Sequence, residues 1–138
     1  MEHDELEERI LLIRRRDRRF DRNAYLWALD LVDFGLERIR SKPGAKQAHL
    51  SATSLLGFVG EFAAKDFGRG ASLVFEAWNI RLTDDVGEII WNLIDNKLLS
   101  AGPNDSRYGF QTQVAIKDLL LPPPEIVDLA PLKSFNEG

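Results

Sequence analysis

The sequence predicts a mainly α-helical protein: one helical domain with a winged-helix-like helix-turn-helix and a small two-stranded β-hairpin. Apolar residues recur at helical spacing in several stretches, which begin at capping residues or end at glycine or proline. Two successive helical stretches then precede a turn signal, which is the order of elements in a winged helix-turn-helix. We place the domain at 1–121, its winged-helix-like part at 71–110, and an extended or disordered C-terminal tail at 122–138.

The first half of the chain predicts three helices. The opening segment is amphipathic, with apolar positions at Leu6, Ile10 and Ile13. Asp21 is the predicted N-cap of a second helix, which ends at the breaking sequence 41–44, Ser-Lys-Pro-Gly. Ser51 is the predicted N-cap of the third helix, and Gly68 ends it. Helical spacing returns once more at 114–121.

The middle of the chain predicts the helix-turn-helix and its wing. A short helix is expected over about 71–78, and Thr83 is the predicted N-cap of a longer helix. The sequence 102–105, Gly-Pro-Asn-Asp, is a strong turn signal. We therefore expect 98–100 and 107–110 to pair as a short antiparallel hairpin.

Composition excludes several classes of protein. The net charge of −4 gives no general attraction to nucleic acid or to anionic membranes. The chain has no cysteine, which excludes disulfides, thiolate nucleophiles and sulfur-ligated zinc. No apolar run approaches the ~20 residues that span a bilayer, and the acidic start does not resemble a signal peptide. We expect a soluble, cytoplasmic protein without a membrane partner; the sequence carries no prediction of oligomeric state.

Catalytic and metal-binding patterns are equally sparse. The two histidines, His3 and His49, lie far apart and follow no zinc spacing. The one dense carboxylate cluster is Asp84, Asp85 and Glu88, in the first turns of a predicted helix, where the helix dipole favours negative charge. A divalent-ion or catalytic role is the alternative interpretation of that cluster. With no phosphate loop, nucleophile elbow or EF-hand loop, we expect no enzyme, no cofactor and no metal.

The longer helix of the helix-turn-helix has the wrong charge for reading DNA. Its acidic residues would be repelled by the phosphate backbone that supplies most of the affinity for DNA. We therefore expect its exposed polar residues to bind a protein partner, together with residues of the predicted turn that the hairpin would bring beside them. The candidate partner-binding residues are Glu88, Asn92, Asp95, Asn104 and Arg107.

An arginine-rich segment, 9–22, is the candidate nucleic-acid surface. Arginine suits phosphate because its guanidinium binds two oxygens at once. The candidate contacts are Arg14, Arg15, Arg16, Arg18, Arg19 and Arg22. Phe20 and Tyr25 lie nearby and could stack on bases. The alternative interpretation is a solvated turn whose arginines pair with the acidic N-terminal residues.

An ordered series of short motifs resembles an uncharacterised family of short bacterial proteins known mainly from planctomycete and verrucomicrobial lineages. The central motif is the run 84–94, DDVGEIIWNLI, and the resemblance covers about 10–110. Supporting matches are Arg16-Asp17 with Arg19-Phe20, Ala24-Tyr25, His49-Leu50-Ser51 leading into Leu55-Leu56, Phe67-Gly68, Trp78-Asn79-Ile80 and Asn104-Asp105-Ser106-Arg107. Arg18 replaces a proline usual in the family, and the segment after Phe110 lacks the family's aromatic, acidic ending. The resemblance implies a single domain and provides no catalytic residues.

Gly87 lies within that central motif. Glycine early in a helix lowers the stability of the helix by about 1 kcal/mol relative to alanine, so a glycine at this position needs an explanation. The reason is the close approach either of a partner or of another part of the same chain.

These observations together predict a non-enzymatic protein-interaction or regulatory module that uses the winged-helix-like region. The alternative from a different class is association with RNA or DNA through the arginine-rich segment 9–22.

Overall fold

Helices form nearly all of the regular structure in the computed structural model, which describes residues 2–44, 50–102 and 105–123. The α-helices are α1 (His3–Arg16), α2 (Arg22–Arg40), α3 (Ala52–Phe67), α4 (Ala71–Ala77) and α5 (Thr83–Asp95). Short 3-10 helices follow as η1 (Gly68–Gly70), η2 (Arg107–Phe110) and η3 (Ile116–Leu119). The prediction of a mainly α protein is confirmed. The predicted boundary at 121–122 stays a prediction, since 124–138 lie outside the described residues.

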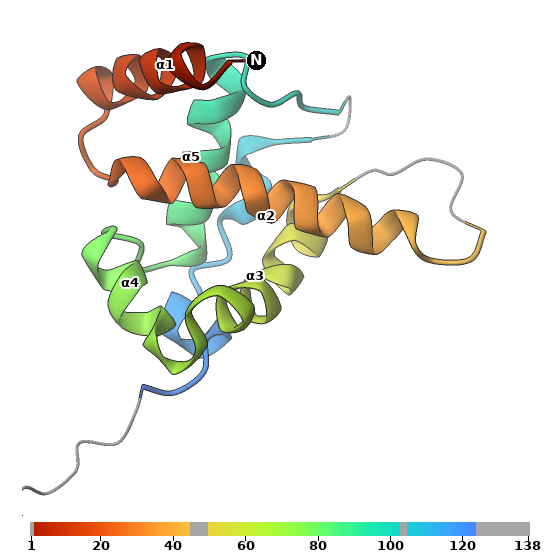
Figure 1. The fold of residues 1–138 in the computed structure, drawn as a ribbon. Helices are drawn as coiled ribbons and strands as arrows, with labels where there is room; N and C mark the ends of the chain where they lie inside the picture. Colours follow the sequence, from red (N-terminus) through yellow and green to blue (C-terminus); the bar gives the residue numbers. More distant parts are fainter. Residues whose placement is uncertain (1, 45–49, 103–104, 124–138) are drawn as a thin grey trace, which may run out of the picture.

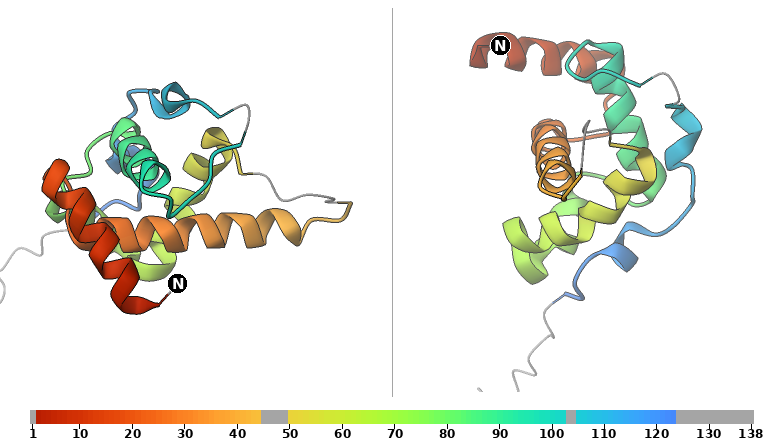
Figure 2. Two further views of the ribbon diagram at one scale, coloured as in Figure 1. Left: turned by 90° about the horizontal axis from the view of Figure 1, so that it is seen from above. Right: turned by 90° about the vertical axis from the view of Figure 1, so that its right-hand side faces the viewer.

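The longest helix, α2, crosses the middle of the molecule, and the others pack around it (Figure 1). α3 and α5 both contact α2, while α4 packs against α3. α1 crosses the N-terminal part of α2 at a steep angle, as Figure 2 shows, and forms one outer edge of the molecule. This arrangement leaves one side of α1 facing away from every other helix.

Two helix starts follow directly from the predicted N-caps. The Asp21 carboxylate accepts a hydrogen bond of 2.8 Å from the backbone N–H of Asn23. The Ser51 hydroxyl accepts one of 3.1 Å from the backbone N–H of Ser54. Both side chains satisfy amides that have no partner within the helix, and both predictions are confirmed.

The start of α5 differs from its prediction. Leu82 rather than Thr83 is the N-cap, and the carboxylate of Asp85 accepts hydrogen bonds from the backbone N–H groups of Arg81 and Leu82, at 2.8 and 3.0 Å. Thr83 is buried, and its hydroxyl is 2.7 Å from that of Thr112. The prediction of a Thr83 cap was wrong because its hydroxyl serves a long-range contact instead.

The core contains a cluster of aromatic rings centred on Trp27 of α2. Its indole packs against Phe62, Phe67, Phe75 and Trp78, with ring centroids 5.0 to 6.2 Å apart. The indole N–H donates a 3.0 Å hydrogen bond to Asp66. Trp27 therefore joins α2 to both α3 and α4.

The predicted two-stranded hairpin is wrong. Residues 107–110 form the 3-10 helix η2, and the described residues contain no strand. The Ser106 hydroxyl accepts from the backbone N–H of Tyr108, and its carbonyl accepts from that of Gly109. These local bonds wind the chain into a helical turn and leave 98–100 without a pairing strand. Within the predicted turn, Pro103 and Asn104 lie outside the described residues.

The reason for this winding is the contact between η2 and α5. Phe110 is buried against Gly87, where a Cβ atom would overlap the Phe110 side chain. The expectation of a close approach at Gly87 is confirmed, and the approaching group belongs to the same chain. The wing of the predicted winged helix is thus replaced by an irregular segment that covers α5.

The chain then returns to the start of α5. An isolated antiparallel bridge pairs Leu82 with Ala115, where the N–H of Thr83 donates to Val114 O and that of Ile116 donates to Arg81 O. The helix expected over 114–121 is only the four residues of η3.

Candidate functional site

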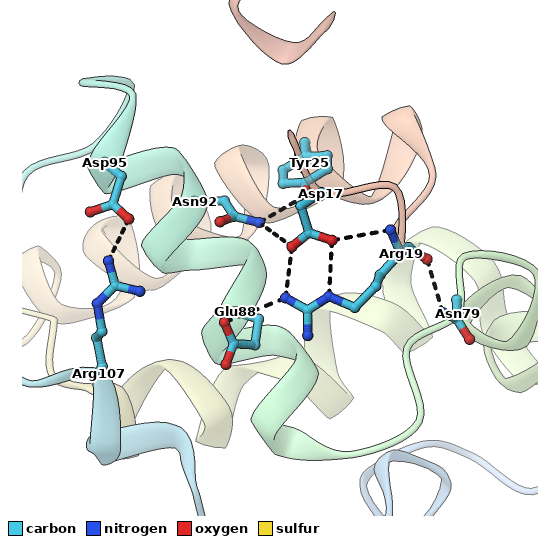
Figure 3. A network of polar contacts seen from close by, with 8 residues as sticks. All are labelled: Asp17, Arg19, Tyr25, Asn79, Glu88, Asn92, Asp95 and Arg107. Atoms are coloured by element: carbon cyan, nitrogen blue, oxygen red, sulfur yellow. Dashed lines mark hydrogen bonds and ion pairs between the residues drawn. The ribbon is translucent and has the colours of Figure 1, made fainter. Parts of the chain in front are cut away.

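The polar face of α5, where partner-binding residues were predicted, is occupied by contacts within the chain (Figure 3). Glu88 lies 3.5 Å from a guanidinium nitrogen of Arg19. Asp95 forms an ion pair with Arg107, which joins α5 to η2. Glu88, Asp95 and Arg107 each keep about half of their side-chain surface exposed. These three residues are therefore still accessible to a partner, whereas the predicted Asn104 lies outside the described residues.

Asn92 has a different role from its neighbours. Its side-chain amide donates to the carboxylate of Asp17 at 3.0 Å and to the hydroxyl of Tyr25 at 3.1 Å. Tyr25 is fully buried, and burial raises the pKa of its hydroxyl. Asn92 therefore holds the α1–α2 turn against α5, and this position contributes to the fold.

Asp17 is the centre of that contact and was not predicted as a site residue. Its carboxylate accepts two hydrogen bonds from the guanidinium of Arg19, at 2.6 and 2.9 Å, and one from the Arg19 backbone N–H. These bonds, with the one from Asn92, hold the pKa of Asp17 far below its usual range. The same ion pair raises the pKa of Arg19. The sequence feature that could have indicated this pairing is the position of Asp17, an aspartate within a run of arginines.

The arginine-rich segment divides into two groups. Arg14 donates to the carbonyl of Phe20 at 3.2 Å, Arg19 binds Asp17, and Arg22 forms an ion pair with Glu7. The remaining three, Arg15, Arg16 and Arg18, are exposed and have no hydrogen bond or ion pair to any described residue. Within the segment 9–22, Arg22 pairs with Glu7 and Arg9 pairs with Glu5, so pairing with the acidic N-terminus accounts for these two arginines. The nucleic-acid interpretation stays a prediction.

The aromatic residues beside this segment are not available to bases. Phe20 and Tyr25 are 1% and 0% exposed and pack edge to face in the core, with centroids 6.4 Å apart. The expectation that they stack on nucleotides was wrong, because both rings are part of the hydrophobic core.

The carboxylate cluster at the start of α5 is also accounted for. Asp85 caps the helix, and Asp84 accepts a 2.9 Å hydrogen bond from the backbone N–H of Gln113. No group of three or more histidine or acidic side chains within 2–44, 50–102 and 105–123 is arranged to hold a metal ion. His3 lies 3.8 Å from Glu7 on the exposed side of α1, and His49 is outside the described residues.

A cavity of about 380 Å³ lies beside α5 and was not predicted from the sequence. Four parts of the chain surround it: α2, the start of α3 with the two residues before it, α5, and the described residues of 99–102 and 105–110. Its apolar lining is Val32, Leu36, Leu50, Ala52, Leu55, Ile90, Trp91, Ile94, Leu99 and Phe110. Its polar lining includes Ser51, Thr53, Ser100, Asp105 and Ser106.

The Asp95–Arg107 ion pair lies beside this cavity, although neither residue lines it. The Arg107 guanidinium lies over the indole ring of Trp91, 5.3 Å from its centroid, while Trp91 lines the cavity. Ile94 and Ser106, the chain neighbours of Asp95 and Arg107, also contribute to the lining. Two predicted partner-binding residues therefore lie at the edge of the cavity.

Comparisons with family models, curated proteins and solved structures give no match to this chain. The resemblance to the bacterial family stays a prediction. In the part of the chain that the structure describes, no helix combines the length and apolar character needed to cross a membrane.

Proposed function

We propose that the protein is a non-enzymatic interaction module whose cavity beside α5 receives an apolar side chain of a protein partner. The cavity carries this proposal: its volume of about 380 Å³ lies within the ~300–1,000 Å³ of typical binding pockets. Apolar walls with hydroxyl groups among them match the composition of protein interfaces, which bury apolar groups at the centre and keep polar groups at the rim.

Charge at the edge of the cavity supports a protein partner over a small apolar molecule. Asp95 and Arg107 pair with each other but remain about half exposed. An exposed ion pair contributes little to stability, so its members can exchange partners at low cost. A partner segment with polar residues on either side of one bulky apolar residue would contact both the cavity and this pair.

The test places a photo-crosslinking amino acid at Thr53, an exposed residue that lines the cavity, and another at Glu76 on the outer surface of α4. We expect one protein to be captured at Thr53 and not at Glu76. The captured protein, once purified, should bind the full chain in calorimetry. Val32→Phe should weaken that binding at least tenfold, because the larger side chain fills the cavity.

The comparison variant is Leu73→Phe, since Leu73 is 62% exposed on α4 and outside the cavity. It should bind as the wild type does. Equal capture at Thr53 and Glu76, or unchanged binding by Val32→Phe with an unchanged melting temperature, would rule out the cavity as the binding site.

A second candidate function is nucleic-acid association, which is favoured by the three arginines that have no partner among the described residues. Exposed arginines can bind phosphate without first breaking an internal ion pair. Binding to single-stranded RNA should then fall with salt by a slope of about 0.7 per phosphate contact. Replacing Arg15, Arg16 and Arg18 by alanine should abolish this binding, whereas Arg22→Ala should not. Binding that changes neither with salt concentration nor in the triple variant would exclude this role.

A further inference from the structure

The outer face of α1 carries a line of side chains that the fold leaves unused. Asp4, Glu8, Leu11 and Arg15 are spaced by four, three and four residues, so they lie along one face of the helix. All four are exposed, and none has a hydrogen bond or ion pair to a described residue. Leu11 and the adjacent Leu12 keep 50% and 51% of their surface exposed.

Charge is ordered along this face. The carboxylates of Asp4 and Glu8 occupy its N-terminal half, the two leucines occupy its middle, and Arg15 lies towards its C-terminal end. Arg18, also exposed, follows in the turn after the helix. The face is therefore negative at one end, apolar at the centre and positive at the other end.

Such a face is complementary to a copy of itself turned end to end. A two-fold axis between Leu11 and Leu12 places Glu8 of each copy opposite Arg15 of the other, because the two residues lie equally far from that midpoint. The leucines of one copy then meet those of the other. Symmetric dimers form through this kind of self-complementary contact, in which the same residues meet twice.

A shallow cavity beside Leu11 gives this face a recess in addition to its charge pattern. It has a volume of about 240 Å³ and lies between α1 and the start of α2. Its lining residues are Glu7, Glu8, Ile10, Leu11, Arg14 and Arg22. This space can receive a leucine side chain from the partner copy, whereas a flat helix face could not.

We propose that α1 is the interface of a homodimer in which two copies pair antiparallel through Glu8, Leu11, Leu12 and Arg15. A nucleic acid is the poorer occupant, since Asp4 and Glu8 on the same line would repel its phosphates. One fourteen-residue helix buries less than the ~800 Å² per partner of a stable complex. The dimer is therefore concentration-dependent, with a dissociation constant of roughly micromolar or weaker.

The test is sedimentation velocity of the full chain over a wide concentration range, at low and at high salt. The wild type should shift from monomer to dimer as concentration rises, and salt should weaken the dimer. Glu8→Arg and Arg15→Glu each bring like charges together twice, so each should raise the dissociation constant at least about tenfold. An equimolar mixture of Glu8→Arg and Arg15→Glu should restore a dimer, because each substituted side chain then faces one of opposite charge in the other copy.

Matched control variants carry the same charge changes on other exposed surfaces. Glu76→Arg on α4 and Arg40→Glu at the end of α2 should dimerise as the wild type does. Circular dichroism should show an unchanged helical signal for Glu8→Arg and Arg15→Glu, as both residues are exposed.

Three outcomes of the sedimentation experiments would overturn the proposal. They are a wild type that stays monomeric at every concentration, variants that dimerise like the wild type, and a mixture that fails to form the mixed dimer. A monomer that binds single-stranded RNA and loses it with Arg15→Glu would also overturn it, in favour of the nucleic-acid alternative.

Discussion

Phe110 occupies the space that a side chain at residue 87 would need, so that Gly87 and Phe110 together fix η2 against α5. A Cβ atom at Gly87 would overlap the Cβ atom of Phe110, which is attached to the backbone and has little freedom to move. The glycine of α5 thus decides where the irregular segment after the helix can lie.

The first prediction concerns this contact. Gly87→Ala should lower the free energy of unfolding by about 1–3 kcal/mol, since overpacking outweighs the gain of up to ~1 kcal/mol in helix propensity. The measurement is urea denaturation. Gly57→Ala is the matched control, because a Cβ at Gly57 in α3 meets nothing within 4 Å; it should be neutral or stabilising. A Gly87→Ala variant as stable as Gly57→Ala would contradict the close packing of Phe110 on Gly87.

The second prediction concerns Gly60, another glycine of α3. A Cβ atom at Gly60 would overlap the backbone carbonyl of Leu119 in η3. Gly60→Ala should therefore detach residues 114–121 from α3. Hydrogen exchange should become faster for the Ile116 and Leu120 amides, which donate to Arg81 and Lys117, and stay unchanged in α2. Unchanged exchange at both amides would show that η3 accommodates the extra methyl group.

The third prediction uses pH. Hydrogen bonds from Arg19 and Asn92 lower the pKa of Asp17 in the folded protein below the ~3.9 of the unfolded chain. Such a group stabilises the fold above the unfolded pKa, and this contribution is lost as pH falls towards the folded pKa. Asp17→Asn should cost about 1–3 kcal/mol at pH 7, and the difference from wild type should shrink below about pH 4.

Urea denaturation of both proteins between pH 7 and pH 2.5 provides this measurement. Asp21→Asn is a useful comparison, because Asp21 caps α2 without binding an arginine. A difference between wild type and Asp17→Asn that stays constant over the whole range would show that the charge of Asp17 does not contribute.

The fourth prediction contrasts two residues on the polar face of α5. Asn92→Ala should destabilise the protein by about 1–3 kcal/mol, since it removes a donor from the Asp17 carboxylate and from the buried Tyr25 hydroxyl. Asp95→Ala breaks only the exposed ion pair with Arg107 and should cost less than about 1 kcal/mol. Thermal unfolding of the two variants under identical conditions ranks their stabilities. A less stable Asp95→Ala than Asn92→Ala would refute the assignment of a structural role to Asn92 and an exposed, weakly stabilising ion pair to Asp95.

Local signals in the sequence were sufficient for most helix boundaries. Asp21 and Ser51 act as caps through bonds to residues two and three positions away, so their neighbours in sequence determine them. The hairpin prediction failed because the turn signal at 102–105 is equally local, whereas the path of 107–110 depends on Phe110 reaching Gly87. The same limit explains Thr83, whose hydroxyl partner Thr112 lies 29 residues away.

The candidate site was predictable as a set of exposed polar residues but not as a set of contacts. Glu88, Asp95 and Arg107 are accessible as expected, while the partners of Asn92 lie 67 and 75 residues away in sequence. The cavity beside α5 depends on four separate segments meeting, and no spacing within one segment indicates it.

The bond between Asp17 and Asn92 has a consequence for how the protein is made. A ribosome releases the chain from its N-terminus, so α1 and α2 are complete before Asn92 is made. Asn92 lies 75 residues after Asp17 and ties the turn between α1 and α2 to α5. Until α5 emerges, the hydroxyl of Tyr25 and the carboxylate of Asp17 lack their shared donor. We expect the nascent helical pair to remain loosely docked during synthesis and to become fixed only when α5 leaves the exit tunnel.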